Sequence, residues 1–247
     1  MKKVLEICCD SINSVENANI GGAQRIELCT ALQTGGLSPT YSFLNNAVKI
    51  SKIPINALLR PRAGNFVYSD AEFQIMCEEL EEMKKAGATG IVSGVLLPNG
   101  RIDKHRTKEL LDLSKPLNFT FHRAIDFCTD IDEAMEFLCD IGAERVLSSG
   151  GFSKIDEGIE SIIELHKKYG KKICIMPGGG LNIENAKILK DAGIYEFHFS
   201  ASEFEEEKNV YSRFPNGLGH VISFEKYGYN YSSQNRIKKM LELLLGF

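Results

Sequence analysis

The feature that most constrains this chain is a regular alternation of short β-rich runs with segments of helical periodicity. Most runs are bounded by turn residues, and segments such as 70–85, 131–141 and 155–169 carry apolar residues at helical spacing. The eight predicted strands are Val4–Cys9, Arg25–Cys29, Ile55–Arg60, Gly90–Val95, Asn118–His122, Arg145–Ser148, Lys172–Met176 and Glu196–Ser200. Strands that alternate with helices form a parallel sheet. Eight such units in 247 residues predict a single (β/α)₈ barrel of the TIM type, in the α/β class.

The rival architecture is a doubly wound open sheet that binds a dinucleotide. The turn after the first strand reads Asp10-Ser11-Ile12-Asn13 and lacks the glycine fingerprint of such a site. We therefore expect one barrel domain over residues 1–247 and no nucleotide or other organic cofactor. An irregular, tyrosine-rich loop is expected at about 202–233, before a last helix at 234–245.

Composition and charge narrow the possible partners and the compartment. The net charge is −4 and the basic residues are scattered, which argues against nucleic acid. No apolar run approaches the roughly 20 residues needed to cross a bilayer. Glu6 and Asp10 interrupt the first apolar stretch, so we expect no signal peptide. Seven cysteines is an odd count and lacks the close spacing of a small secreted scaffold, so we expect a reducing compartment and a cytoplasmic protein without disulfides.

Polar side chains inside the predicted strands share one parity. Successive side chains on a strand point to opposite faces, and the opposite, apolar parity must pack against the helices. The polar set is therefore expected to point into the barrel, mostly toward the carboxyl ends of the strands, where barrel active sites lie. Its members are Glu6, Cys8, Glu27, Cys29, Asn56, Arg60, Thr120, His122, Glu196, His198 and Ser200.

These residues could form the acid–base site of an enzyme. Buried carboxylates at Glu6 and Glu27 need cationic partners, and Arg60 is the expected one. Either glutamate would serve as general base, and His122 or His198 as the acid. A divalent metal held by the two glutamates and the two histidines is a variant of this hypothesis.

Two segments could bind the anionic or phosphorylated substrate of such an enzyme. Arg60 and Arg62 share a parity and offer two guanidinium groups as an anion clamp. The turn Gly178, Gly179 and Gly180 precedes a predicted helix, whose amino end could cradle a phosphate. The alternative for the arginine segment is a helix-entry loop with surface arginines. The alternative for the glycine segment is a tight strand-to-helix turn.

The cysteines suggest a different chemistry. Cys8 and Cys9 are adjacent on one strand and face opposite ways, so they cannot line one site. Cys8 and Cys29 share inward parity on neighbouring strands about 4.8 Å apart, so both sulfurs could reach one ion. Two thiolates suit Cu(I). The alternative is that both are small apolar core side chains.

A set of short motifs is spread along most of the chain: Glu6-Ile7-Cys8, Asp10-Ser11, Arg25-Ile26-Glu27-Leu28-Cys29, Gly35-Gly36-Leu37-Ser38-Pro39, Arg60-Pro61-Arg62, Tyr68-Ser69-Asp70, Thr120-Phe121-His122-Arg123-Ala124 and Pro177-Gly178-Gly179-Gly180. In these motifs the chain resembles the copper homeostasis protein CutC family, although 203–247 matches poorly and Ala63 replaces a frequent glycine. The resemblance implies a cytoplasmic, often oligomeric (β/α)₈ barrel linked to copper tolerance, with Cys8 and Cys29 as Cu(I) ligands.

A non-catalytic interaction protein that uses the tyrosine-rich loop is a third hypothesis.

Overall fold

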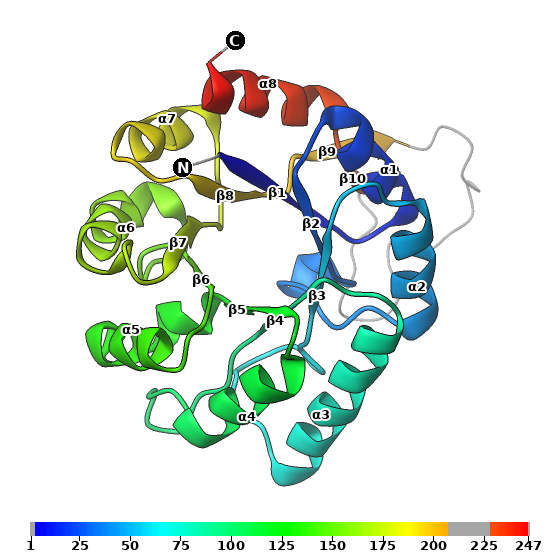
Figure 1. The fold of residues 1–247 in the computed structure, drawn as a ribbon. Helices are drawn as coiled ribbons and strands as arrows, with labels where there is room; N and C mark the ends of the chain where they lie inside the picture. The colour runs from blue at the N-terminus through cyan, green and yellow to red at the C-terminus, as the bar shows by residue number, and fades with distance from the viewer. Residues whose placement is uncertain (1–2, 207–227, 247) are drawn as a thin grey trace, which may run out of the picture.

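Eight parallel strands form the centre of the molecule in a computed structural model that describes residues 3–206 and 228–246 (Figure 1). The predicted (β/α)₈ barrel is confirmed. The strands pair in the order β7-β6-β5-β4-β3-β2-β1-β8. They are β1 Val4–Cys9, β2 Arg25–Leu28, β3 Ile55–Leu58, β4 Gly90–Ser93, β5 Asn118–Phe121, β6 Arg145–Ser148, β7 Cys174–Pro177 and β8 Glu196–Phe199.

The helices surround the strands as an outer ring (Figure 1). Local sequence fixes where several of them start: α3 begins after Ser69, whose hydroxyl accepts from the Glu72 amide while the Glu72 carboxylate accepts from the Ser69 amide. The helices are α1 Ile12–Gly21, α2 Tyr41–Ile50, α3 Asp70–Lys85, α4 Lys104–Ser114, α5 Ile131–Asp140, α6 Ile155–Tyr169, α7 Ile183–Asp191 and α8 Gln234–Leu245, with short 3₁₀ turns η1 Leu32–Thr34 and η2 Arg123–Phe127.

Side-chain parity divides the barrel into two apolar regions. The outward parity, including Leu5, Ile7 and Cys9, belongs to the large core between strands and helices. A smaller, separate cluster inside the barrel contains Cys8, Cys29, Leu58 and Val92. The predicted separation of Cys8 from Cys9 is therefore confirmed, and both thiols of the Cys8/Cys29 pair lie inside the barrel.

The ring of backbone pairing has one gap. Seven neighbouring pairs of strands have a parallel register, but β7 and β8 share none among the described residues. The two strands nevertheless lie side by side, and Gly178, directly after β7, is so close to β8 that an added Cβ would lie 3.2 Å from the Cβ of His198. The two strands are thus neighbours there without a ladder of backbone hydrogen bonds.

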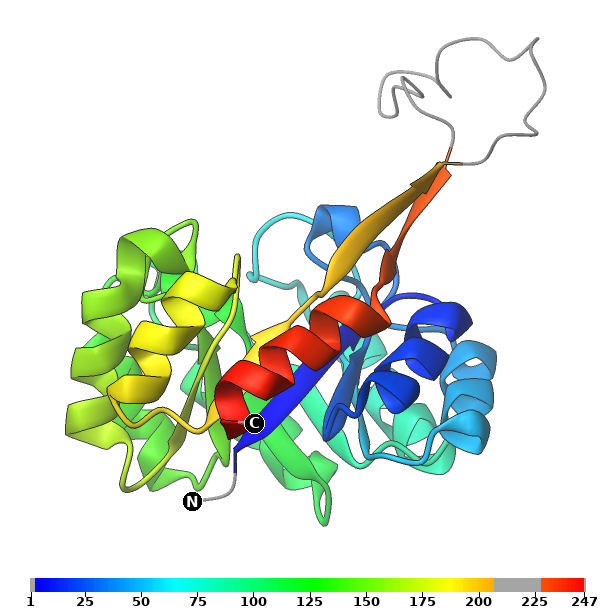
Figure 2. The ribbon, with the colours of Figure 1, turned by 90° about the horizontal axis from the view of Figure 1, so that it is seen from above.

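The segment expected to be an irregular loop begins and ends as paired strands. β9, Ser202–Glu206, and β10, Gly228–Ser232, form an antiparallel ribbon in which Ser202 faces Ser232. This ribbon projects away from the barrel (Figure 2). Backbone pairing between the two ends of the segment replaces the irregular structure predicted there, and its middle, 207–227, lies outside the described residues.

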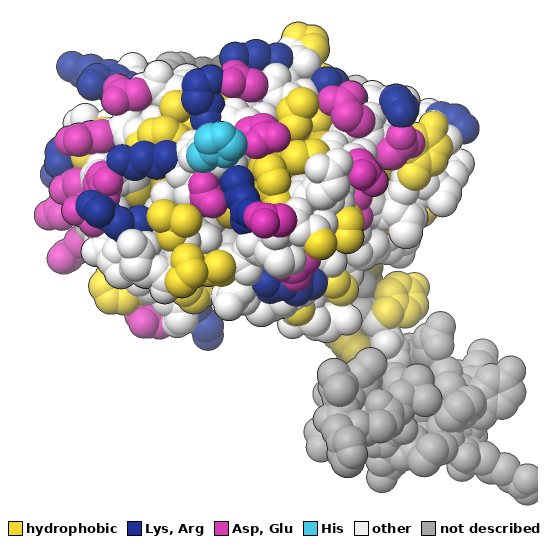
Figure 3. Space-filling view, turned by 90° about the horizontal axis from the view of Figure 1, so that it is seen from below, with side chains coloured by type: hydrophobic (Ala, Val, Ile, Leu, Met, Phe, Trp, Pro, Cys, Tyr) yellow, Lys and Arg dark blue, Asp and Glu magenta, His cyan; other side chains and the backbone are white. Residues whose placement is uncertain are grey.

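The surface mixes charges of both signs. On the face drawn in Figure 3, Lys and Arg side chains alternate with Asp and Glu, and apolar side chains are scattered between them. In the part of the chain that the structure describes, no helix combines the length and the apolar character needed to cross a membrane.

Candidate functional site

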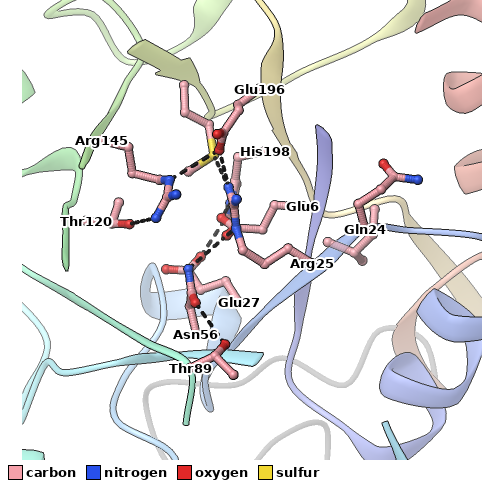
Figure 4. Close-up of polar contacts among 12 residues, drawn as sticks. Glu6, Gln24, Arg25, Glu27, Asn56, Thr89, Thr120, Arg145, Glu196 and His198 are labelled. Atoms are coloured by element: carbon pink, nitrogen blue, oxygen red, sulfur yellow. Dashed lines mark hydrogen bonds and ion pairs between the residues drawn. The ribbon is translucent and has the colours of Figure 1, made fainter. Parts of the chain in front are cut away.

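A belt of ion pairs crosses the barrel interior (Figure 4), mainly between residues at the amino ends of the strands. The Arg25 guanidinium pairs with the Glu6 carboxylate and, at 2.6 Å, with the Glu196 carboxylate. Arg145 also pairs with Glu196, at 3.2 Å. Arg60 was the expected partner of the buried glutamates, and this expectation is wrong because the β1–β2 register places Arg25 directly beside Glu6.

On the side of this belt nearer the carboxyl ends of the strands, His198 bridges Glu6 and Glu27. Its Nδ1 lies 2.9 Å from Glu6 Oε1 and its Nε2 lies 3.3 Å from Glu27 Oε2. Burial would raise the pKa of Glu6, but the charge of Arg25 and the hydrogen bond with His198 hold it well below its ordinary value. Burial raises the pKa of Glu27 to about 6, although the charge of His198 opposes this. Burial opposes protonation of His198, yet Glu27 and Glu6 raise its pKa above the usual value.

The two inward thiols lie one step nearer the mouth. Cys8 Sγ and Cys29 Sγ are 3.7 Å apart, and both side chains are buried. The hydrogen bond with Cys29, together with burial, raises the pKa of the Cys8 thiol well above its ordinary value. The Cys8 thiol is therefore protonated at neutral pH, and a bound cation would have to displace its proton.

One group of side chains has the spacing of a metal site. The donor atoms of Cys8, Glu27 and His198 all lie within 4.8 Å of one another. Glu6 accepts from the far side of the His198 ring, which is the arrangement that orients metal-binding histidines in proteins. Sulfur, imidazole nitrogen and carboxylate oxygen are thus available together at this point of the barrel.

A cavity of about 980 Å³ opens at the carboxyl ends of the strands. The thiol pair and the His198–Glu27 pair form its floor, and apolar side chains contribute much of its wall. Residues of the ribbon, Ser202 and Asn230, also line it. Of the predicted site residues, the cavity brings together Cys8, Glu27, Cys29, Arg60, His122, Gly179, Gly180 and His198. Glu6 lies beneath it, and Arg62 and Gly178 are not part of its lining.

The two arginines expected to clamp an anion have different environments. Arg60 lines the cavity and donates to the carbonyls of Thr34 and Gly36. Arg62 is turned away: it pairs with Glu72 on α3 and donates to the Val67 carbonyl at 2.7 Å. The structure therefore does not bring the two guanidinium groups together, because the chain after Arg60 leaves the strand and no longer follows its parity.

His122 is a buried residue in the wall of the cavity. Its Nδ1 accepts from the Ala124 amide at 3.2 Å, so the hydrogen of the neutral ring is on Nε2. Burial, helped by the charge of Arg60, lowers the pKa of His122 to about 3. The pKa of His122 is thus lowered whereas that of His198 is raised, a difference that residue type alone could not predict.

The glycine turn after β7 is tightly packed by protein groups. An added Cβ on Gly179 would lie 2.8 Å from a guanidinium nitrogen of Arg123. The first amides of α7 are capped, since the Asn182 side chain accepts from Asn185. Anion binding at Gly178, Gly179 and Gly180 stays a prediction, and Arg123 covers part of the space that it requires.

Sequence reasoning missed two members of the belt, Arg25 and Arg145. Both have the inward parity, two residues before Glu27 and Leu147 respectively, so alternation alone could have identified them. They were not predicted because each is the first residue of its strand, whereas the predicted site lay at the carboxyl ends of the strands.

The fold and the site define a class of protein: a (β/α)₈ barrel with two buried thiols beside a histidine–glutamate pair at the floor of the cavity. The chain belongs to the CutC family, whose model matches residues 3–203. It is 36% identical to a CutC family protein of Bacteroides fragilis strain YCH46, over 98% of both chains. It is 42% identical to one of Glaesserella parasuis serovar 5, over 80% of this chain and 82% of the relative.

Solved structures agree with this assignment. A CutC protein of Streptococcus agalactiae, named for copper homeostasis, is 30% identical with a TM-score of 0.76, covering 80% of this chain and 98% of its own. Thiamine phosphate pyrophosphorylase from Pyrococcus furiosus has a TM-score of 0.60 at 13% identity, covering 98% of this chain and 96% of its own. The second likeness shows the barrel fold alone.

Proposed function

We propose that this protein acts in copper homeostasis and binds Cu(I) through the thiolates of Cys8 and Cys29. The observation that carries the proposal is the 3.7 Å separation of their sulfurs at the floor of the cavity. Soft thiolate ligands select Cu(I). The apolar neighbours Leu58 and Val92 suit a soft ion better than a strongly hydrated one. The copper-related name of the Streptococcus agalactiae relative supports the same cargo.

An anaerobic Cu(I) competition titration tests this proposal. We expect one tight site per chain in the wild type and its loss in the Cys8→Ser, Cys29→Ser double variant. The matched control is the Cys77→Ser, Cys139→Ser double variant, because those thiols are free, half-buried and on helices. Equal Cu(I) affinity in all three proteins would contradict the proposal.

A second candidate function is catalysis on a small anionic substrate. The observation in its favour is the Glu27–His198 pair, because a carboxyl with a pKa of about 6 beside an imidazole can exchange protons near neutral pH. The reaction would be an isomerase, lyase or hydrolase type. Incubation with a metabolite extract, followed by mass spectrometry, should show a compound consumed by the wild type and spared by Glu27→Gln. Identical profiles would count against catalysis.

Kinship with the CutC family also supports a cytoplasmic location and a homo-oligomeric assembly for this chain. The assembly is tested by light scattering on the purified full chain. A mass that is a multiple of 27.5 kDa supports it, and a monomer at micromolar concentration would contradict it.

A further inference from the structure

Arg60 is a buried cation without an anionic partner. Only 6% of the residue is exposed, and three backbone carbonyls accept its hydrogen bonds: Thr34 and Gly36 from Nη1, at 3.0 and 2.8 Å, and Gly64 from Nη2, at 3.0 Å. The neutral hydroxyl of Tyr68 also interacts with it. No carboxylate of residues 3–206 or 228–246 pairs with it. A guanidinium has five N–H donors, so two remain unused, and the buried Nε is one of them. A buried charge of this kind is costly unless a counter-charge compensates it.

His122 provides a second unused donor beside Arg60. Because its Nδ1 accepts from the Ala124 amide, the neutral ring carries its hydrogen on Nε2, and that atom is buried without a partner among the described residues. Both side chains contact the same aromatic ring: the ring centres of His122 and Phe66 are 4.8 Å apart, and Arg60 Cζ lies 5.2 Å from the centre of Phe66. All three residues line the cavity.

A glycine between the two residues makes this arrangement possible. β4 lies between β3, which leads to Arg60, and β5, which leads to His122. An added Cβ on Gly94, just after β4, would lie 2.7 Å from His122 Nδ1. The His122 ring therefore occupies the space that a side chain at position 94 would fill.

We propose that the cavity binds a small organic acid whose carboxylate is held between Arg60 Nε and His122 Nε2. One cation matches one negative charge, because His122 is neutral and the other cavity arginine, Arg123, is already paired with Asp126 at 2.9 Å. A carboxylate is therefore a better match in charge than a dianionic phosphate. The body of the acid would contact an apolar wall, formed by Leu58, Phe66, Leu96, Leu97 and Phe127.

This site is separate from the proposed copper ligands and does not depend on copper. Its most direct test is histidine-selective NMR of the wild type with acetate, isovalerate and 4-fluorobenzoate, each compared with its neutral amide. We expect at least one acid to shift the His122 Nε2–H resonance saturably at millimolar concentration, and no amide to do so. Silence with all three acids, or equal shifts with the amides, would overturn the proposal.

Two conservative variants distinguish a site from a structural arginine. Arg60→Lys retains the positive charge but loses the planar donors, so acid binding should weaken about tenfold or more while the circular dichroism spectrum stays unchanged. Arg62→Lys is the matched control, since Arg62 pairs with Glu72 outside the cavity lining, and should bind as the wild type does. Equal weakening in both variants would overturn the proposal.

Two further arms identify the ligand class and separate this site from the copper site. Inorganic phosphate should compete weakly with 4-fluorobenzoate in ¹⁹F NMR, and phosphate binding tighter than any acid would overturn the carboxylate assignment. The Cys8→Ser, Cys29→Ser variant should bind acids as the wild type does, whether or not its Cu(I) site exists. Loss of acid binding in that variant would contradict a separate site.

Discussion

At the scale of single residues, the belt around Arg25 is the part of the site whose energetics are clearest. Arg25 neutralises both Glu6 and Glu196 inside the barrel, where an unpaired carboxylate is strongly unfavourable. We predict that Arg25→Met lowers the free energy of unfolding by about 3–5 kcal/mol. Urea denaturation would measure this loss. Arg101→Met removes an exposed ion pair with Glu133 and should cost less than about 1 kcal/mol; equal costs would contradict the assignment.

His122 gives a pH dependence with a defined sign. Burial and the charge of Arg60 lower its pKa to about 3 in the folded chain, whereas the unfolded value is about 6.5. As the pH falls below 6.5 the unfolded state takes up this proton first, so the stability that His122 contributes is present above that pH and is lost on acidification. Between pH 7 and pH 5, in buffers free of carboxylates, the wild type should lose about 2 kcal/mol more than His122→Gln. Parallel losses would mean that His122 is protonated in the folded protein.

Parity at the residue scale predicted which side chains face inward, but not their height in the barrel. Cys8 and Cys29 were paired correctly because alternation and neighbouring strands suffice for that inference. The partner of Glu6 was wrong because it depends on the β1–β2 register, and a strand sequence does not encode register by itself. The path of the loop after β3, which turns Arg62 toward Glu72, was likewise not readable from parity.

At the scale of elements, helix α3 shows how local sequence positions the residues around the mouth. The reciprocal bonds between Ser69 and Glu72 start the helix, and the same Glu72 carboxylate binds Arg62. We predict that Ser69→Ala lowers the free energy of unfolding by about 1 kcal/mol, because one helix amide loses its acceptor. Ser42→Ala, on the exposed face of α2, should change it by less than about 0.5 kcal/mol. Chemical denaturation of both variants measures the difference, and equal effects would contradict the role of the cap.

At the scale of the whole molecule, the alternation of strands and helices was sufficient to predict the barrel and, within a residue or two, most of its elements. The paired ribbon of β9 and β10 was not predicted, because its pairing joins segments far apart in the chain and the sequence between them carries turn-forming residues. The β7–β8 gap in backbone pairing was also not predicted, since a strand sequence does not encode its pairing by itself.

Copper binding to the folded barrel should stabilise the entire molecule. A ligand that binds only the native state adds about 2.7 kcal/mol when its free concentration is a hundred times its dissociation constant. Anaerobic calorimetry with buffered Cu(I) should therefore raise the melting temperature of the wild type and of the Cys77→Ser, Cys139→Ser control. The Cys8→Ser, Cys29→Ser variant should melt at the same temperature with and without Cu(I), and a comparable rise in that variant would place the ion elsewhere.

The most direct test of the central claim is X-ray absorption at the copper edge of the Cu(I)-loaded full chain. The account predicts two sulfur ligands in the wild type and in the Cys77→Ser, Cys139→Ser control, and their loss in the Cys8→Ser, Cys29→Ser variant. A coordination shell of nitrogen and oxygen alone in the wild type, or an unchanged sulfur shell in the Cys8→Ser, Cys29→Ser variant, would contradict it.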